Sequence, residues 1–219
     1  MFTEKLDDDS IIRFQCACCG SCCRSGLDIF LNPLDVWNIR NAMKKPTQFL
    51  KRNYFRFETM LEYGVYPFCL IKMRKNGYCP FAEDNLCSIH HFRPAACRFY
   101  PVVHYFDGKR ESSFAVSPDV PGCPGLKAEK KYSLQGWLIV NKFLMYEGII
   151  EMTPEIAEAL GKPFDEEISA PLFDIMFNFD EVDDFPFRDS FPMEGSSDDK
   201  FAAWLRRKVR AYIRSLSGG

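Results

Sequence analysis

The sequence predicts an α+β fold: a small, metal-stapled, cysteine-rich domain with short β-hairpins and helices, followed by a mainly helical C-terminal extension. Two observations support this prediction. All ten cysteines of the 219-residue chain precede Pro124. Beyond them, apolar residues recur at helical spacing and no cysteine occurs. We therefore expect a cysteine-cluster metal-binding domain over residues 14–126 and a helical extension over residues 127–219.

The densest cysteine run places five thiols in eight residues near the N-terminus, which is too crowded to be explained by packing. Four of them form a C-x-x-C-x-x-C-C pattern: Cys16, Cys19, Cys22 and Cys23. Its two-residue spacers let successive thiolates converge on one centre, as zinc and iron–sulfur sites require. Neighbouring side chains of extended backbone face opposite ways, so Cys22 and Cys23 predict two sites or one shared cluster. Disulfides or reduced, buried thiols are the alternative.

A short strand and two helices are predicted next. Residues 27–31 alternate polar and apolar side chains, which favours a strand. Asn32 and Pro33 then supply the cap and first turn of a short helix. Apolar residues at helical spacing predict a second helix over residues 47–64, which begins at a threonine and ends at a glycine.

Two hairpins are predicted beyond these helices. Residues 65–73 and 78–81 flank a turn and should form the first hairpin, with Cys79 at its end. Residues 102–106 and 111–116 should form the second. Four later cysteines lie in and around these hairpins: Cys79, Cys87, Cys97 and Cys123. Their wide spacing alone is a weak signal of metal binding, but together with the first run it is a strong one.

These residues together resemble the YkgJ-like cysteine-cluster (CxxCxxCC) family of zinc- or iron-chelating proteins, which are often regarded as iron–sulfur proteins. The resemblance covers about residues 14–126. It rests on Phe14-x-Cys16-x-x-Cys19-Gly20-x-Cys22-Cys23, Cys79-Pro80-Phe81, Cys87-x-Ile89-x-x-x-Arg93-Pro94-x-x-Cys97-Arg98-x-x-Pro101 and Gly122-Cys123. It implies metal ligation by Cys16, Cys19, Cys22, Cys23, Cys79, Cys87, Cys97 and Cys123.

Three other residues near this pattern are not expected to be essential ligands. Cys18 and Cys69 fall outside it and are interpreted as spare or buried thiols. His90 stands where the family commonly has tyrosine. The remaining histidines, His91 and His104, are expected at the surface or behind the ligands.

An iron–sulfur cluster is the favoured cofactor, because a dense C-x-x-C-x-x-C run is a common start of such a site. Zinc is the alternative, although structural zinc favours two separated C-x-x-C pairs. A chain without a stable metal is the third reading. Arg93 and Arg98 flank a cysteine and either offset thiolate charge or form ordinary ion pairs.

The C-terminal extension shows helical patterning and no chemical signature. Helices are predicted over residues 133–148 and 153–161, and an acidic surface segment over residues 173–187. A basic amphipathic helix follows from Lys200. Such a helix can bind a membrane, an acidic partner or RNA. We expect it to dock its apolar face on its own domain.

Composition and charge bear on the partners and the cellular compartment of the protein. A formal charge of −2 gives no case for nucleic acid binding, and no apolar run is long enough to span a membrane. The acidic first ten residues do not resemble a secretory signal. We expect a cytoplasmic protein, where thiols stay reduced and free to bind metal; a protein partner would be of unknown identity.

The function predicted is that of a metal-binding protein that holds an iron–sulfur cluster, iron or zinc. No dinucleotide, phosphate-loop, serine-hydrolase or zinc-protease motif marks a conventional enzyme. One alternative is a structural zinc-binding interaction module. Another is an iron–sulfur redox or protein-modification enzyme, since flagellin lysine methylases resemble distant carriers of a related cysteine run. A third is storage or delivery of metal.

Overall fold

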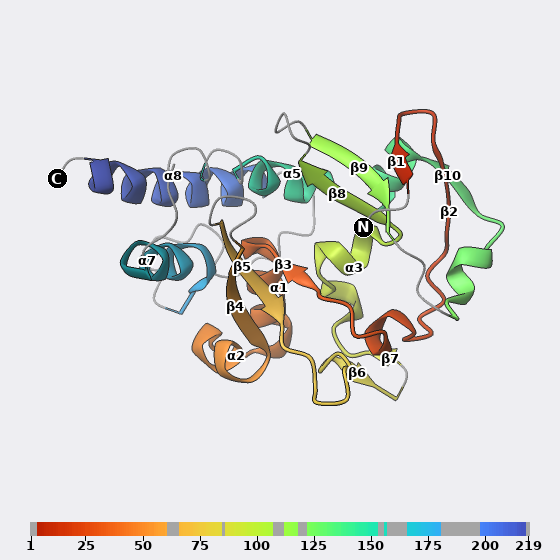
Figure 1. Ribbon diagram of the computed structural model, residues 1–219, viewed down its shortest axis with the longest axis horizontal. Coiled ribbons are helices and arrows are strands. Elements are labelled where there is room, and N and C mark those ends of the chain that lie inside the picture. Colours follow the sequence, from red (N-terminus) through yellow and green to blue (C-terminus); the bar gives the residue numbers. More distant parts are fainter. Residues whose placement is uncertain are drawn as a thin grey trace. The chain divides into compact units, whose positions relative to one another are not determined.

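The computed structural model describes residues 4–60, 66–84, 86–106, 112–117, 122–152, 156, 166–180 and 198–217. Helices and small antiparallel sheets alternate along these segments, which confirms the α+β class (Figure 1). The chain divides into two compact units. Unit 1 comprises Met1–Ile29 and Ile71–Leu144, and unit 2 comprises Phe30–Leu70 and Met145–Gly219.

This division differs from the one expected at residue 126. Residues 30–70 cluster with the C-terminal helices instead of with the cysteine-rich segments. The reason is apolar packing: the helix that contains Trp37 contacts the helix before Phe179, and the two rings meet edge to face at 5.6 Å. Nine of the ten cysteines lie in unit 1, and Cys69 alone lies in unit 2.

Unit 1 contains a three-stranded antiparallel sheet in the order β1-β9-β8. Its strands are β1 (Glu4–Leu6), β9 (Ser112–Val116) and β8 (Val102–Phe106). The pairing of β8 with β9 confirms the second predicted hairpin, whose turn lies outside the described residues. A core cluster packs beside the sheet: Leu6, Ile12, Phe14, Val102, Leu134 and Trp137.

A second small sheet in unit 1 leads into a helix. Strand β10 (Lys131–Ser133) pairs with β2 (Ile11–Arg13), and α4 (Leu134–Val140) follows. The Ser133 hydroxyl accepts a hydrogen bond from the Gly136 N–H, so serine caps the helix as predicted. The helix does not continue to residue 148, because Lys142 adopts a left-handed conformation (φ 61°) before α5 (Leu144–Ile150) begins.

The remaining elements of unit 1 are short. They are the 3₁₀ helices η1 (Cys22–Arg24), η3 (His90–Phe92) and η4 (Pro124–Lys127), the paired strands β6 (Ala82–Glu83) and β7 (Leu86–Cys87), and α3 (Ala95–Phe99). Residues 78–81 do not form the returning strand of a hairpin, contrary to prediction. The Cys79 N–H instead donates to the Cys23 carbonyl at 2.7 Å, so this segment is held by the first cysteine run.

Unit 2 contains a three-stranded sheet in the order β3-β5-β4, formed by β3 (Phe30–Leu31), β5 (Tyr66–Ile71) and β4 (Phe55–Met60). Alternation of polar and apolar residues over 27–31 predicts β3, and β5 lies within the strand expected over residues 65–73. The helix predicted over residues 47–64 ends at Asn53, because residues 55–60 form β4 instead; residues 61–64 lie outside the described residues. Phe55 and Phe57 alternate with Arg56 and Glu58, a period of two that suits a strand paired with β5.

Two helices precede β4 in the chain. Helix α1 (Pro33–Met43) begins with the predicted cap: the Asn32 side chain accepts from the Asp35 N–H, and the Asp35 carboxylate accepts from the Asn32 N–H. Helix α2 (Thr47–Asn53) follows Pro46. In β5, Cys69 is fully buried opposite Leu31, which confirms its reading as a packed thiol.

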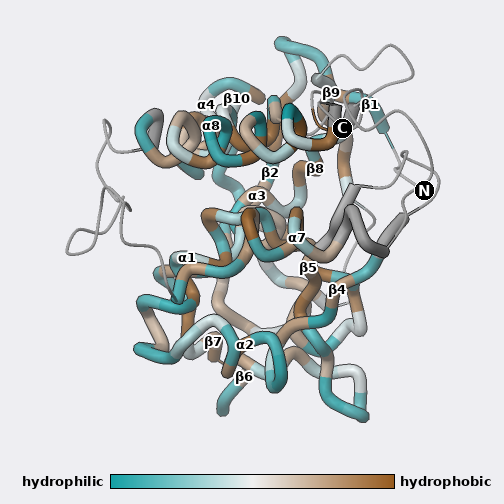
Figure 2. Tube along the Cα trace, turned by 90° about the vertical axis from the view of Figure 1, so that its left-hand side faces the viewer, coloured by the Kyte–Doolittle hydropathy of each residue, from teal (hydrophilic) through white to brown (hydrophobic). Residues whose placement is uncertain are grey.

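The two longest helices described in the C-terminal extension lie in unit 2. Helix α7 (Glu166–Phe177) occupies part of the segment predicted as an acidic surface, and it forms because Leu172, Met176 and Phe177 are buried. Helix α8 (Asp198–Ser217) confirms the predicted last helix, with hydrophobic and hydrophilic residues alternating along it (Figure 2). The helix predicted over residues 153–161 and the segment 181–187 lie outside the described residues, apart from Ile156.

The apolar face of α8 is packed within unit 2, as expected. Its large apolar residues are buried: Phe201, Trp204, Leu205 and Val209. Helix α8 contacts α7, and Phe201 packs on Phe179 with ring centroids 6.0 Å apart. A β-carbon at Gly148 would lie 2.9 Å from the Ala202 β-carbon, so α5 also approaches α8 closely. Among the described residues, no helix is long and apolar enough to cross a membrane.

Candidate metal centre

The loop that contains the first cysteine run is anchored in the core of unit 1. Phe14, just before the run, is buried and meets Tyr100 and Trp137 edge to face, with ring centroids 5.3 and 5.7 Å away. Beyond it the chain has no regular structure until η1. Cys18 and Gly20 both adopt left-handed backbone angles (φ 52° and 69°), which coil the loop back on itself.

The loop that contains Cys123 packs against the start of the first cysteine run. The Gln15 N–H donates to the Gly125 carbonyl at 3.2 Å. A β-carbon at Gly125 would lie 2.5 Å from the Gln15 carbonyl oxygen and 2.8 Å from the Phe14 ring, so only glycine fits. This close approach brings Cys123 to Cys19. The pKa of Cys19 is lowered, first by its hydrogen bonds with the Ser21 side chain and backbone and further by one with Cys123.

Cys79 joins the end of the run through its backbone and its thiol. The Cys22 and Cys23 sulfurs lie 4.0 Å apart, and the Cys23 thiol shares a hydrogen bond with Cys79. The hydrogen bond with Cys23, followed by burial, raises the pKa of Cys22 well above the usual thiol range. The hydrogen bond from Cys22 lowers the pKa of Cys23, but its bond to Cys79, burial and the charges of Cys79 and Cys87 together raise that pKa to about 12.

Cys87 and Cys97 complete the group. Cys87 ends β7 and Cys97 lies in α3. Burial, then the charges of Cys22 and Cys16, raises the pKa of Cys87, and the charge of Cys97 acts on Cys79. All eight cysteines of the expected ligand set therefore lie in one neighbourhood of unit 1. None of the ten cysteines, all within the described segments, forms a disulfide.

Two arginines beside the thiols have unused donors. The Nε atoms of Arg93 and Arg98 are buried and have no hydrogen-bond partner among the described residues. The Arg93 charge lowers the pKa values of Cys18 and Cys87 against larger raising effects, chiefly burial, so this guanidinium lies beside the thiols. Arg98 directly follows Cys97 in α3. Buried N–H donors beside thiols suit an anionic, sulfur-rich bound group, whose sulfur atoms accept hydrogen bonds.

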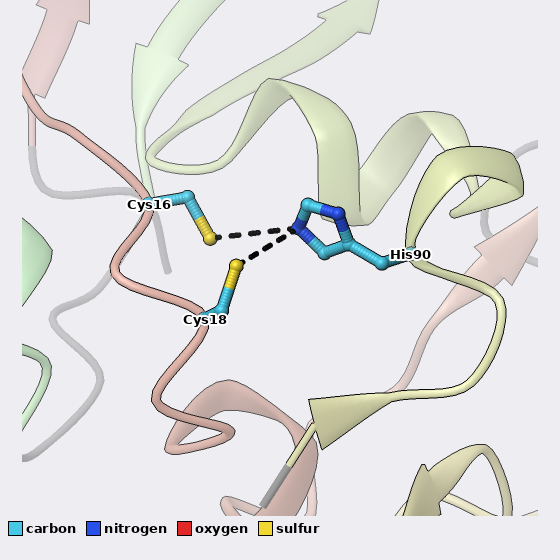
Figure 3. Close-up of side chains that lie close together, drawn as sticks. All are labelled: Cys16, Cys18 and His90. Atoms are coloured by element: carbon cyan, nitrogen blue, oxygen red, sulfur yellow. Dashed lines mark hydrogen bonds between the residues drawn. The ribbon is translucent and has the colours of Figure 1, made fainter.

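Cys16, Cys18 and His90 form the tightest group of donor atoms. The His90 Nε2 lies 3.9 Å from the Cys16 sulfur and 3.5 Å from the Cys18 sulfur (Figure 3). Among the described residues, these three are the one set of His, Cys, Asp or Glu whose donor atoms all lie within 4.8 Å of one another. Burial, followed by the charge of Arg93, lowers the pKa of His90, which keeps the imidazole neutral.

Sequence reasoning set aside two members of this group. Cys18 interrupts the C-x-x-C spacing, and His90 replaces the residue common in the resembled family. The signal that could have linked them is that both depart from the same family pattern. His104 lies apart in the β8–β9 sheet, where burial lowers its pKa to about 4 and its Nε2 lies 2.7 Å from the Ser112 hydroxyl.

A comparison with protein families identifies the cysteine-rich segment. The model of the CxxCxxCC family, described as "Putative zinc- or iron-chelating domain", matches residues 15–124. The match spans half of the chain and contains all ten cysteines. No curated protein and no solved structure matches the chain. The chain therefore belongs to the CxxCxxCC family of zinc- or iron-chelating domains.

Proposed function

We propose that the protein uses its eight pattern cysteines to hold an iron–sulfur cluster. The observation that supports this most is the gathering of eight thiols from separate segments of unit 1. The eight are Cys16, Cys19, Cys22, Cys23, Cys79, Cys87, Cys97 and Cys123. A single tetrahedral ion takes four ligands, so eight thiols are more than one such ion can use. A centre with several metal atoms, or two centres, would use them all.

The spacing of the sulfurs also favours a wide centre. Around one tetrahedral zinc ion, four thiolates at about 2.3 Å would lie about 3.8 Å from one another. Among the described cysteines, no three pattern sulfurs lie mutually within 4.8 Å. The sulfurs instead meet in pairs, Cys22 with Cys23, Cys23 with Cys79, and Cys19 with Cys123. An array of this kind suits a cluster in which sulfide ions separate the irons.

The charge and donors around the thiols support the same proposal. A cluster bound by thiolates is anionic; Arg93 lies beside Cys18 and Cys87, and Arg98 directly follows Cys97 in α3. Their buried, unpartnered Nε–H groups would donate to thiolate or sulfide sulfur. Cys22 and Cys23 have raised pKa values, so both are protonated near neutral pH and binding would release their protons.

The test is anaerobic purification followed by an absorption spectrum and by analysis of iron, zinc and acid-labile sulfide. We expect iron and sulfide in comparable amounts, with sulfide-to-iron charge-transfer absorption that fades on reduction. Iron or zinc bound without sulfide would contradict the cluster.

A structural zinc module is the second candidate, and one observation favours it. The 4.0 Å between the Cys22 and Cys23 sulfurs is close to the separation expected of two ligands on one zinc ion. In that case zinc would be present without sulfide, and its removal by a chelator would unfold unit 1.

A further inference from the structure

We propose that Cys16, Cys18 and His90 form a second metal site, which takes one zinc-like divalent cation and leaves one coordination position open. Neither Cys18 nor His90 belongs to the ligand set of the function proposed above, so this site goes beyond that function. It shares Cys16 with the eight-cysteine centre, where one thiolate would bridge the two, and it does not depend on which metal that centre holds. A neutral imidazole and two thiolates are donors that suit zinc and cobalt.

The distances between the donor atoms are those of a coordination sphere. With zinc at about 2.3 Å from sulfur and about 2.05 Å from nitrogen, tetrahedral geometry separates sulfur and nitrogen by about 3.6 Å. The His90 Nε2 lies 3.5 Å from one sulfur and 3.9 Å from the other. Both thiols point toward this nitrogen from the first cysteine loop (Figure 3). A single cation could therefore bind all three with small adjustments of side chains.

The backbone at Cys18 sets the direction of its thiol. Its φ of 52° lies in the left-handed region, which residues with a β-carbon seldom adopt. Lys44 at the end of α1 and Lys142 between α4 and α5 share this conformation, so the contact of the thiol, and not the φ value, points to a ligand. Here the strain directs the Cys18 thiol toward His90, 72 residues further along the chain.

Arg93 contacts both ring nitrogens of His90. Its Nη1 lies 2.7 Å from Nε2 and 3.3 Å from Nδ1. An arginine can only donate, so the imidazole accepts, and the shorter distance assigns this role to the Nε2 lone pair. A cation needs the same lone pair. A cation would take the place of Arg93 at Nε2.

Exposure distinguishes this site from the rest of the thiols. Cys16 and Cys18 are exposed, whereas Cys79 is buried and Cys22 and Cys23 are half-buried. Three protein ligands leave the fourth position to water or to a donor from another molecule. Such a site can exchange its metal with the surroundings. Cys16 also belongs to the eight-cysteine group through its proximity to Cys87, so it lies between the two sites.

The experiment uses cobalt(II) as a probe on the full-length, metal-loaded protein after dialysis against a weak chelator. Iron, zinc and sulfide are measured before each titration. We expect the wild-type protein to bind one added equivalent of cobalt, with the visible bands of a tetrahedral ion and the near-ultraviolet absorption of cobalt–thiolate bonds. Cys18→Ser and His90→Phe should each weaken this binding at least tenfold.

The matched controls are His91→Phe, a neighbouring histidine, and Cys69→Ser, a thiol in unit 2. Both should bind cobalt as the wild type does. The iron and sulfide of the purified protein should not differ among wild type, Cys18→Ser and His90→Phe. Circular dichroism shows whether Cys18→Ser or His90→Phe fails to fold. If one of them does, the cobalt affinity of the other tests the proposal.

Three outcomes would overturn the proposal. The wild-type protein could bind no cobalt, or both variants could bind it as tightly as the wild type. Cys18→Ser could also lose the metal of the purified protein, which would place Cys18 in the main centre. A purified protein with zinc and no sulfide would contradict the iron–sulfur cluster but would leave the cobalt result intact.

Discussion

At the scale of single residues, the two cysteines outside the family pattern have different surroundings. Cys69 is fully buried in β5, and burial raises its pKa well above the usual range. Cys18 is exposed beside His90. The sequence could identify Cys69 as a packed thiol, because apolar residues surround it in the chain. It could not place Cys18, whose neighbour lies 72 residues away and is brought there by the tertiary fold.

The pattern cysteines should be far more sensitive to substitution than Cys69. We expect Cys19→Ala and Cys97→Ala to give metal-poor or aggregated protein, since a lost ligand forfeits binding energy that also stabilises the fold. Cys69→Ala should keep its metal and lose about 1–3 kcal/mol in the free energy of unfolding, the usual range for a small buried cavity. Metal analysis and urea denaturation measure the two effects. Equal metal contents in Cys19→Ala and Cys69→Ala would show that Cys19 is not a ligand.

Gly125 is a second residue whose substitution tests the centre. A β-carbon there would collide with the Gln15 carbonyl, so the loop of Cys123 would have to move. We expect Gly125→Ala to lose about 1–3 kcal/mol of stability, as overpacked sites do, and to bind less metal. Thermal unfolding and metal analysis measure these. The control is Ala128→Ser, three residues away in the same loop, which should change neither.

At the scale of elements, capping residues were the most readable part of the sequence. Asn32 and Ser133 begin α1 and α4 as predicted, because their side chains satisfy N–H groups within the next few residues. The secondary structure of residues 55–60 was harder to predict. Their apolar residues also fit helical spacing, but pairing with β5 makes the segment a strand. In the described part of the predicted acidic segment, residues 173–177 are helical and Asp180 is held by α2: its carboxylate accepts from the Thr47 and Gln48 N–H groups at 2.6 and 2.9 Å.

Asp180 should therefore make the stability of unit 2 depend on pH. Burial raises its pKa, but hydrogen bonds from Gln48 and Thr47 and the nearby Arg40 outweigh burial, and the net pKa is lowered. Its stabilisation is then complete above the ordinary carboxyl pKa, near about 4, and is lost as pH falls through the lowered value. We expect Asp180→Asn to cost about 0.5–2 kcal/mol at neutral pH, as loss of a helix cap does.

The difference in unfolding free energy between wild type and Asp180→Asn should shrink as pH falls below about 4, measured by denaturation at a series of pH values. Asp174→Asn is the control, because Asp174 is 58% exposed and pairs with Lys51 at the surface. A difference that stays constant with pH would contradict the carboxylate's role.

At the scale of the whole molecule, the chemistry and the C-terminal helices belong to different units. The eight pattern cysteines are in unit 1, whereas α7 and α8 are in unit 2. The uneven distribution of cysteines predicts a boundary near residue 126, whereas α4, in the predicted extension, belongs to unit 1 and only α7 and α8 lie wholly in unit 2. It could not show that residues 30–70 join them, because that grouping depends on which apolar faces meet. A helix shows the same spacing of apolar residues whether it packs in unit 1 or in unit 2.

Variants of α8 should thus change stability more than metal binding. We expect Leu205→Ala, at a fully buried site, to lose about 2–5 kcal/mol in the free energy of unfolding. The exposed Arg207 provides the control, because Arg207→Ala should change stability by less than about 0.5 kcal/mol. Iron, zinc and sulfide per chain should stay nearly unchanged in both, as they should after removal of residues 200–219. Salt-sensitive RNA binding that disappears with this truncation would instead identify α8 as a reader of nucleic acid.

The division of unit 1 into two stretches of chain also bears on how the protein is made. A ribosome that adds about 5–20 residues per second would finish Cys23 roughly 5–20 s before Cys123, which lies 100 residues later (123 − 23). During that interval the first thiols would be present without the later cysteines, while the segment that forms part of unit 2 is being synthesised. Nascent chains would then be most open to oxidation, or to the wrong metal, before the second half of unit 1 emerges.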